Sequence, residues 1–263
     1  MNYISIHPLQ LGLALLLLLG NLGLSLMLKL KLERSLGIAV ARMTIQLLLV
    51  GMILEWIFAL RSFIWVMVGA LIMTTIASIS AVNRTKRRFP GIYWHSFVSI
   101  LGSAFIVTGI GLTGIIQVTP WYEPRYFFPI FGMILGNILN GISLGLDRFM
   151  EEIVTHRDKI ETSLALGATR WEAIQETMRN TLRTGMIPIL NTMMIAGVVS
   201  LPGMMTGQIL SGTPPIEAVR YQIVIMVLIA SAVAFGLTGV ILLAFFRLFT
   251  PQHQLREDLL ISK

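Results

Sequence analysis

Seven long apolar stretches, separated by polar connectors, limit what this chain can fold into. A helix needs roughly 20 apolar residues to cross about 30 Å of hydrocarbon, and each stretch is long enough. Their approximate limits are 8–28, 37–60, 62–82, 93–116, 125–146, 184–207 and 218–246. The first has no positive leader and no small-x-small cleavage site, so it is expected to be a span rather than a signal peptide. The sequence therefore predicts an all-α polytopic membrane protein with about seven transmembrane helices.

The amino-acid composition supports a membrane protein and limits the functions that it can have. The chain is 55% hydrophobic and only 13% charged, whereas soluble domains carry about a quarter charged residues. Its polar sequence is too short for a separate soluble catalytic domain, so transport would need an ion gradient or another subunit. Basic residues lie at span ends rather than on one face, which argues against a nucleic-acid partner. We expect one membrane domain over residues 1–263, embedded in the lipid bilayer and without enzymatic activity of its own.

Connector charge predicts the orientation, because Lys and Arg resist translocation. One alternate set of connectors is strongly basic: Lys29, Lys31, Arg34, Arg84, Lys86, Arg87, Arg88, Arg148, Arg157, Lys159, Arg170, Arg179, Arg183, Arg247, Arg256 and Lys263. The other set contains only Arg61, Arg125 and Arg220. The N-terminus is therefore expected outside and the C-terminus in the cytoplasm.

The charged segment, residues 147–183, stands out on the predicted cytoplasmic side. Helically spaced apolar residues predict an amphipathic helix that continues from the fifth span. Gly167 then suits the positive φ that ends many helices, and Thr169 with Glu172 has the spacing of a capping box. The sequence predicts helix, sharp turn and helix. An ordinary hairpin on the lipid surface is the alternative, although the acidic residues of the segment reduce its attraction to anionic lipid.

The turn resembles the cytoplasmic loop of ABC transporter permeases. Glu161 is followed six residues later by Gly167 within Leu-Gly-Ala, while Thr162 and Ser163 replace the usual alanines. In that family the loop is a coupling helix that docks on an ATPase subunit. The resemblance implies ATPase contact through five residues: Glu161, Leu166, Gly167, Ala168 and Trp171.

ATP chemistry is expected on another chain. This sequence contains no Gly-x4-Gly-Lys-Ser/Thr loop to cradle phosphates. The resemblance therefore implies that ATP and magnesium bind a separate ABC ATPase subunit, present in two copies beside a homodimer of this chain. No cofactor is expected on the chain itself.

A second resemblance rests on the sequence Leu201-Pro-Gly-Met-Met-Thr-Gly207-Gln and on Tyr221-Gln-Ile223. It is similar to the signature of a small seven-span permease family, whose bacterial members are described as iron exporters and whose plant relatives are linked to aluminium tolerance. Arg42, Gln46 and Gly136-Asn137 also match that pattern. The resemblance implies an ABC exporter subunit in a bacterial cytoplasmic (inner) membrane, carrying iron or another metal cation.

Polar and sulfur-containing residues within the spans are pathway candidates: Arg42, Gln46, Glu55, Asn137, Met204, Met205 and Gln208. Each has a structural alternative: snorkelling for Arg42 and Glu55, helix packing for Asn137 and core filling for the methionine pair. Pro202 and Gly203 are expected to kink or end the sixth span and to act as a hinge. The four histidines, His7, His95, His156 and His253, are far apart and define no metal site.

Two other functions stay open at this point. A gradient-driven secondary transporter would need intramembrane carboxylates, for which only Glu55 is a candidate. A non-transporting subunit would use the charged segment to recruit a cytoplasmic protein.

Overall fold

The computed structural model describes residues 8–60 and 62–262. It divides into two compact units, one on each side of the boundary between Arg61 and Ser62. His7, Arg61 and Lys263, which entered the sequence analysis, lie outside the described residues. The predicted all-α class is confirmed, because the described chain consists of helices apart from one pair of two-residue strands.

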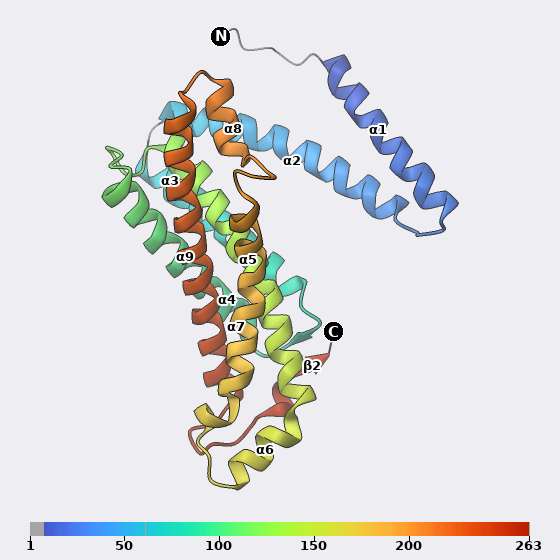
Figure 1. The fold of residues 1–263 in the computed structure, drawn as a ribbon, viewed down its shortest axis with the longest axis vertical. Helices are drawn as coiled ribbons and strands as arrows, with labels where there is room; N and C mark the ends of the chain where they lie inside the picture. The colour runs from blue at the N-terminus through green and yellow to red at the C-terminus, as the bar shows by residue number, and fades with distance from the viewer. Residues whose placement is uncertain (1–7, 61, 263) are drawn as a thin grey trace. The chain divides into compact units, whose positions relative to one another are not determined.

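The first unit is a hairpin of α1 (Pro8–Met27) and α2 (Glu33–Leu60), drawn in blue in Figure 1. Its connector is closed by Ser25, whose hydroxyl donates to the Glu33 carboxylate at 2.8 Å and accepts from the backbone N–H of Leu32 at 3.2 Å. Most described side chains of α2 are exposed within this unit. An apolar helix that is not buried by protein suits a hydrocarbon surrounding.

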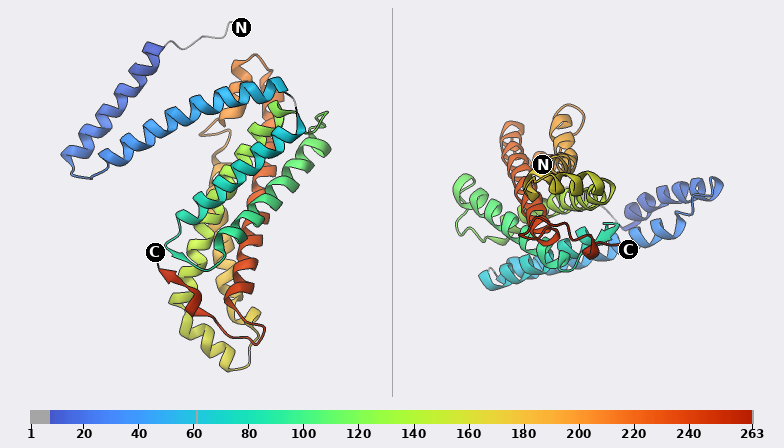
Figure 2. Two further views of the ribbon diagram at one scale, coloured as in Figure 1. Left: turned by 180° about the vertical axis from the view of Figure 1, so that it is seen from behind. Right: turned by 90° about the horizontal axis from the view of Figure 1, so that it is seen from below.

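The second unit is a bundle of seven helices among the described residues (Figures 1 and 2). They are α3 (Phe63–Asn83), α4 (Ile92–Gly109), α5 (Pro124–Thr155), α6 (Arg157–Ala165), α7 (Arg170–Ile195), α8 (Gly203–Leu210) and α9 (Pro215–Leu248). A π-helical stretch, Ile110–Ile115, extends α4. After α9, a short 3₁₀ turn at Glu257–Leu259 leads to β2 (Ile261–Ser262), which pairs antiparallel with β1 (Arg87–Arg88).

Helix α5 is the centre of the bundle, since it packs against α3, α4, α7 and α9. Its apolar residues recur every three or four positions, which places them along one stripe of a helix. The fully enclosed members of this stripe are Phe127, Phe131, Ile134, Ile138, Ile142, Leu146, Phe149 and Ile153. The same periodicity continues past the apolar stretch into the charged segment, so α5 extends beyond the predicted span.

Small residues allow α5 and α7 to approach closely. A Cβ atom added at Gly185 would lie 2.9 Å from the Gly141 carbonyl oxygen, and one added at Gly141 would lie 3.1 Å from the Gly185 carbonyl oxygen. Leu237 of α9 fills the remaining space beside Gly185 and Gly145. Gly136, by contrast, faces open space. The backbones of α5 and α7 therefore meet at these two glycines, where a larger residue would force the helices to shift, and α9 adds the Leu237 side chain.

Five helices of the described chain are long and apolar enough to cross a membrane: Glu33–Leu60, Phe63–Asn83, Ile92–Ile115, Pro124–Thr155 and Pro215–Leu248. The predicted sixth span, 184–207, is wrong as a single helix. Its first part belongs to α7, which starts at Arg170 within the charged segment, and residues 196–202 are not helical. One helix thus contains a charged half and an apolar half, which confirms that the helix after the turn leads into the sixth span.

Replacing Gly185 with leucine is expected to destabilise the bundle by about 3 kcal/mol, because the side chain would collide with the backbone of α5. Gly136→Leu is the matched control in α5, since its Cβ meets nothing within 4 Å. Thermal unfolding in detergent, followed by circular dichroism, compares the two. Equal unfolding temperatures would show that the close contact contributes nothing to stability.

Candidate functional site at the charged end and the α7–α8 break

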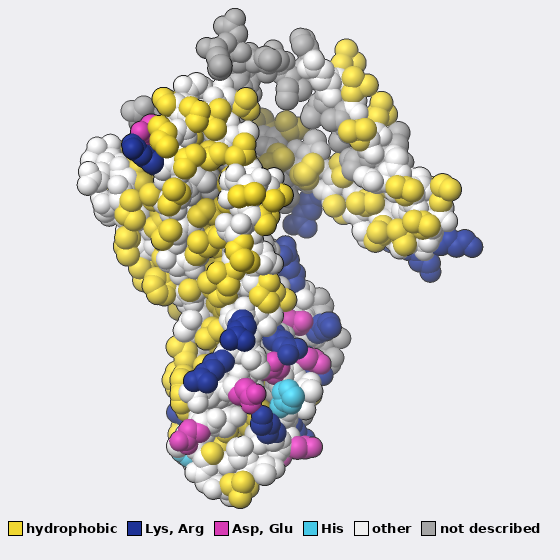
Figure 3. Space-filling model, viewed as in Figure 1, with side chains coloured by type: hydrophobic (Ala, Val, Ile, Leu, Met, Phe, Trp, Pro, Cys, Tyr) yellow, Lys and Arg dark blue, Asp and Glu magenta, His cyan; other side chains and the backbone are white. Residues whose placement is uncertain are grey.

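Charged side chains gather at one end of the second unit, whereas the visible face beside them is mostly hydrophobic (Figure 3). We call this region the charged end. It comprises the connector 84–91, the last turns of α5, helix α6, the first turns of α7 and the residues after α9.

The C-terminal half of α5 holds the connector 84–91. Asn140 accepts from Arg84 at 2.8 Å, Asp147 accepts from the backbone N–H of Lys86 at 2.7 Å, and Glu151 pairs with Arg87 at 3.4 Å. The three α5 residues are seven and four apart and so share one helix face. Two acidic residues of the charged segment therefore bind this chain itself.

Helix α6 is separate from α5, which corrects the predicted continuous helix. The break lies at His156, whose φ of −105° and ψ of 21° are not helical. Ile160 is buried between α6 and its neighbours, and Lys159 bridges to Glu176 of α7 at 2.6 Å. That bridge lowers the pKa of Glu176 through the Lys159 hydrogen bond and charge. Glu161 pairs with Arg157 at 2.9 Å and stays half exposed.

The predicted turn and capping box are confirmed. Gly167 has φ +93°, the left-handed conformation that favours glycine. The Thr169 hydroxyl accepts from the Glu172 backbone N–H, and the Glu172 carboxylate accepts from the Thr169 N–H at 2.8 Å. Hydrogen bonds from Thr169 also lower the pKa of Glu172. Leu166 is 84% exposed at this turn, which leaves a large apolar side chain available to a partner.

The start of α7 is anchored to the chain's own C-terminal residues, which the sequence analysis missed. The backbone N–H of Arg170 donates to His253 Nδ1 at 3.0 Å, and its guanidinium lies 5.4 Å from the Phe245 ring centroid. Trp171 packs edge-on against the same ring at 5.6 Å and is 46% exposed. Part of the Trp171 side chain therefore serves internal packing. Ala168 is half-buried beside it in the turn.

The helical backbone is interrupted again at the other end of α7. Residues 196–202 connect α7 to α8, with Gly197 at φ +82° and Pro202 as the residue before α8. The helix was expected to kink or end near Pro202 and Gly203, but α7 already ends at Ile195, and Pro202 directly precedes α8. A hinge role for Pro202 and Gly203 stays a prediction. Val198 is 88% exposed in this connection.

A pocket of about 450 Å³ lies beside this break, between α7, α8 and α9. Its lining includes Met193, Pro202, Met205, Gln222 and Met226. Gln222 is only 8% exposed, and its carbonyl oxygen has no hydrogen-bond partner among the described residues. A buried polar atom without a partner is costly in a folded protein, so it marks a site where a ligand could bind. Sequence reasoning used Gln222 only as part of a motif.

The structure separates the other pathway candidates. Arg42 and Gln46 line one exposed face of α2, and Glu55 is exposed farther along that helix, all within the first unit. Asn137 donates to the Met133 carbonyl at 2.9 Å within α5.

In α8, Met205 is 7% exposed and lines the pocket, whereas Met204 is half-buried. Gln208 of the same helix has a buried carbonyl oxygen without a hydrogen-bond partner in the part of the chain described. Across residues 8–60 and 62–262, no group of three or more His, Asp or Glu is placed to hold a metal ion.

Residues 8–249 match the uncharacterised protein family UPF0014. The chain belongs to the UPF0014 family. It is 39% identical to a UPF0014 membrane protein of Synechocystis sp., over 82% of this chain and 83% of that relative. The family relationship makes it a membrane protein of the permease type and agrees with its apolar helices.

Two further relatives have descriptive names. One is the "Probable iron export permease protein FetB" of Escherichia coli, 30% identical over 82% of each chain. The other is "Protein ALUMINUM SENSITIVE 3" of Arabidopsis thaliana, 31% identical over 85% of this chain and 81% of the relative. No solved structure matches this UPF0014 chain.

Thr169→Val is expected to raise hydrogen exchange at the start of α7, because it removes the hydroxyl of the capping box. Thr162→Val is the matched control, since Thr162 is exposed and its hydroxyl has no hydrogen-bond partner among the described residues. Because the folded pKa of Glu172 lies below its ordinary value of 4.5, the box contributes fully above that value and is lost as pH falls through the lowered pKa. Equal exchange in both variants at neutral pH would contradict this role for Thr169.

Proposed function

We propose that this chain is the membrane-spanning permease subunit of an ATP-driven ABC export complex for iron or another metal cation. The observation that carries the proposal is the exposed turn at Leu166, joined directly to a helix that leads to the pocket. The name of the Escherichia coli relative supports export of iron. Glu161, Leu166, Gly167, Ala168 and Trp171 form the proposed contact with the ATPase.

Helix α7 is the proposed transmission element. It contains 26 residues and therefore extends about 39 Å at 1.5 Å per residue. One end carries the turn, and the other carries Met193 at the pocket. Contact with α5 at Gly185 places a close-packed pivot between them. A push by the ATPase on the turn would tilt α7 about this contact and change the shape of the pocket.

The assembly follows from the same proposal. In the proposed topology the chain has seven spans, with the N-terminus outside and the charged end in the cytoplasm. Five spans are the long apolar helices, another is α1, and the remaining one is formed by α7 together with α8. Two copies of the chain bind two ATPase subunits, which hold ATP and magnesium. The proposed location is the bacterial cytoplasmic (inner) membrane.

The pocket beside the α7–α8 break is the proposed pathway segment. It offers an uncharged oxygen of Gln222 and the thioethers of Met193, Met205 and Met226. Neutral ligands hold a cation weakly compared with a cluster of carboxylates or imidazoles. Low-affinity binding is compatible with transport, because a transported ion must also be released. Asn137, Met204 and Gln208 are secondary pathway candidates, as are Arg42, Gln46 and Glu55 on α2.

Leu166→Asp is expected to abolish co-purification of the ATPase, because a carboxylate would enter an apolar contact. Gln252→Asp is the control, since it adds a carboxylate at another exposed position of the charged end, outside the proposed contact with the ATPase. Affinity purification of tagged chain from its native membrane measures the associated ATPase. Loss of the ATPase in both variants would contradict a specific docking role for the turn.

Reconstitution of the purified complex tests the cargo and the energy source. ATPase activity of the unmodified complex is expected to rise with iron, whereas ATPase added to vesicles that contain the Leu166→Asp chain is expected to stay at its basal rate with or without iron. Metal transport driven by an ion gradient without any ATPase would instead establish a secondary transporter. A co-purified protein with no transport in vesicles would establish a recruiting subunit.

Gln222→Leu is expected to keep or raise the unfolding temperature while reducing metal transport. Removing a buried oxygen that lacks a donor relieves a desolvation penalty of about 1–3 kcal/mol, whereas the pathway loses a ligand. Thermal unfolding and vesicle transport are measured on the same preparation. A lower unfolding temperature would show that Gln222 has a structural partner, and unchanged transport would remove it from the pathway.

A further inference from the structure

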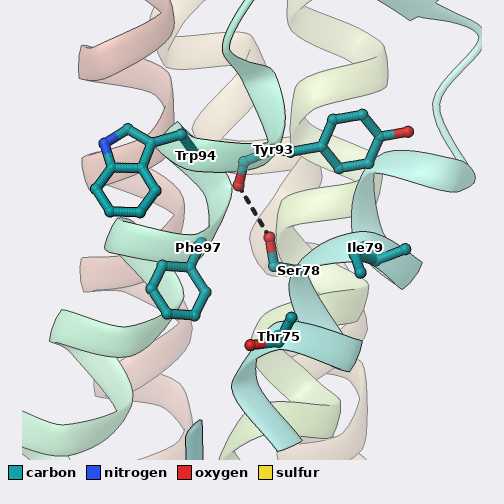
Figure 4. A pocket seen from close by; sticks show the side chains of 6 residues that line it. All are labelled: Thr75, Ser78, Ile79, Tyr93, Trp94 and Phe97. Atoms are coloured by element: carbon teal, nitrogen blue, oxygen red, sulfur yellow. Dashed lines mark hydrogen bonds between the residues drawn. The ribbon is translucent and has the colours of Figure 1, made fainter. Parts of the chain in front are cut away.

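A second pocket, of about 720 Å³, lies between α3 and α4, away from the α7–α8 break. Its lining consists of Thr75, Ser78 and Ile79 from α3 and Tyr93, Trp94 and Phe97 from α4. We call it the α3–α4 groove (Figure 4). These residues occupy the last turns of one candidate span and the first turns of the next. The groove therefore lies at a membrane boundary.

The walls of the groove present apolar surface. Trp94 stacks on Phe97, with ring centroids 5.8 Å apart, and is 66% exposed. The three hydroxyls of the lining are already used, because Thr75 donates to the Leu71 carbonyl at 2.8 Å, Ser78 to the Tyr93 carbonyl at 3.1 Å and Tyr93 to Asn83 Oδ1 at 3.1 Å. Figure 4 shows the bond between Ser78 and Tyr93. Apart from the Trp94 indole, which carries an N–H, an occupant of the groove would therefore meet hydrocarbon and aromatic rings.

A positive charge lies at the Tyr93 side of the groove. The Arg88 guanidinium is 5.6 Å from the centroid of the Tyr93 ring, and its Nη2 donates to Asn83 Oδ1 at 3.0 Å. Among the described residues, no carboxylate forms an ion pair with Arg88. The nearby Arg87 differs, since Glu151 pairs with it. The charge of Arg88 is thus available to an anion at the membrane surface.

We propose that the α3–α4 groove binds an anionic phospholipid. Its acyl chain lies against Trp94, Phe97 and Ile79, and its phosphate lies beside Arg88. Aromatic side chains are favoured at the boundary between hydrocarbon and headgroups, and basic residues there attract anionic lipid. The positive charge of Arg88 matches the phosphate of such a lipid, and the apolar walls of the groove match its acyl chain. This binding does not depend on the proposed transport activity.

The full chain in nanodiscs, with either phosphatidylglycerol or phosphatidylcholine carrying the same acyl chains, provides the test. Native mass spectrometry counts the lipid molecules retained by the protein. Arg88→Gln is expected to lower retention of phosphatidylglycerol about fivefold, the equivalent of ~1 kcal/mol per basic residue near the surface, and to leave phosphatidylcholine unchanged. Lys86→Gln is the matched control, because it removes an exposed charge two residues away that is not beside the groove.

Equal retention of both lipids by the unmodified chain would overturn the proposal, as would equal losses in the two variants. A photo-crosslinking residue in place of Phe97 gives a second measurement that does not require the Arg88 variant to fold. It is expected to attach to phosphatidylglycerol. Attachment to a second copy of the chain would show that the groove is instead an interface between protomers.

Discussion

The backbone contact between Gly141 and Gly185 sets the arrangement of the second unit. Because neither glycine has a side chain, α5 and α7 approach until each carbonyl oxygen lies where a Cβ atom of the other would be crowded. Leu237 of α9 then packs beside both helices. In hydrocarbon, helices gain little from burying apolar surface against each other, so close packing of this kind holds them together. The position of α7, and of both its ends, depends on this contact.

The charged end shows a different use of polar residues. Asp147 and Glu151 bind the connector between α3 and α4, and Glu176 binds Lys159 across α6 and α7. Each exposed ion pair of this kind contributes little to the free energy of unfolding. Together, however, the pairs fix which residues face outward. Most of the acidic side chains therefore have internal partners. The large apolar side chain left most exposed at the turn is Leu166.

The two ends of α7 differ in how the backbone stops being helical. At the turn, Gly167 and the capping box satisfy the backbone groups locally, as in a soluble protein. At the α7–α8 break, Pro202 and Gly197 interrupt the chain in an apolar region, and the carbonyl oxygen of Gln222 is buried there. Irregular backbone at membrane depth is tolerated where it is enclosed by protein or lines a cavity. Gly197 and Pro202 line the pocket beside Met205, whereas Val198 is exposed.

The sequence by itself determined the helical class, the turn at Gly167 and the capping box, because these follow from local periodicity and from hydrogen bonds between residues three apart. It placed the break of the sixth span near Pro202, whereas α7 ends at Ile195, seven residues earlier. It also predicted that the helix after the turn leads into the sixth span, as α7 does. Only the tertiary structure shows that His253 anchors Arg170, that Gly141 meets Gly185, and that Gln222 and Met205 line one pocket. Those contacts join residues far apart in the chain, and their geometry depends on how several helices pack at once.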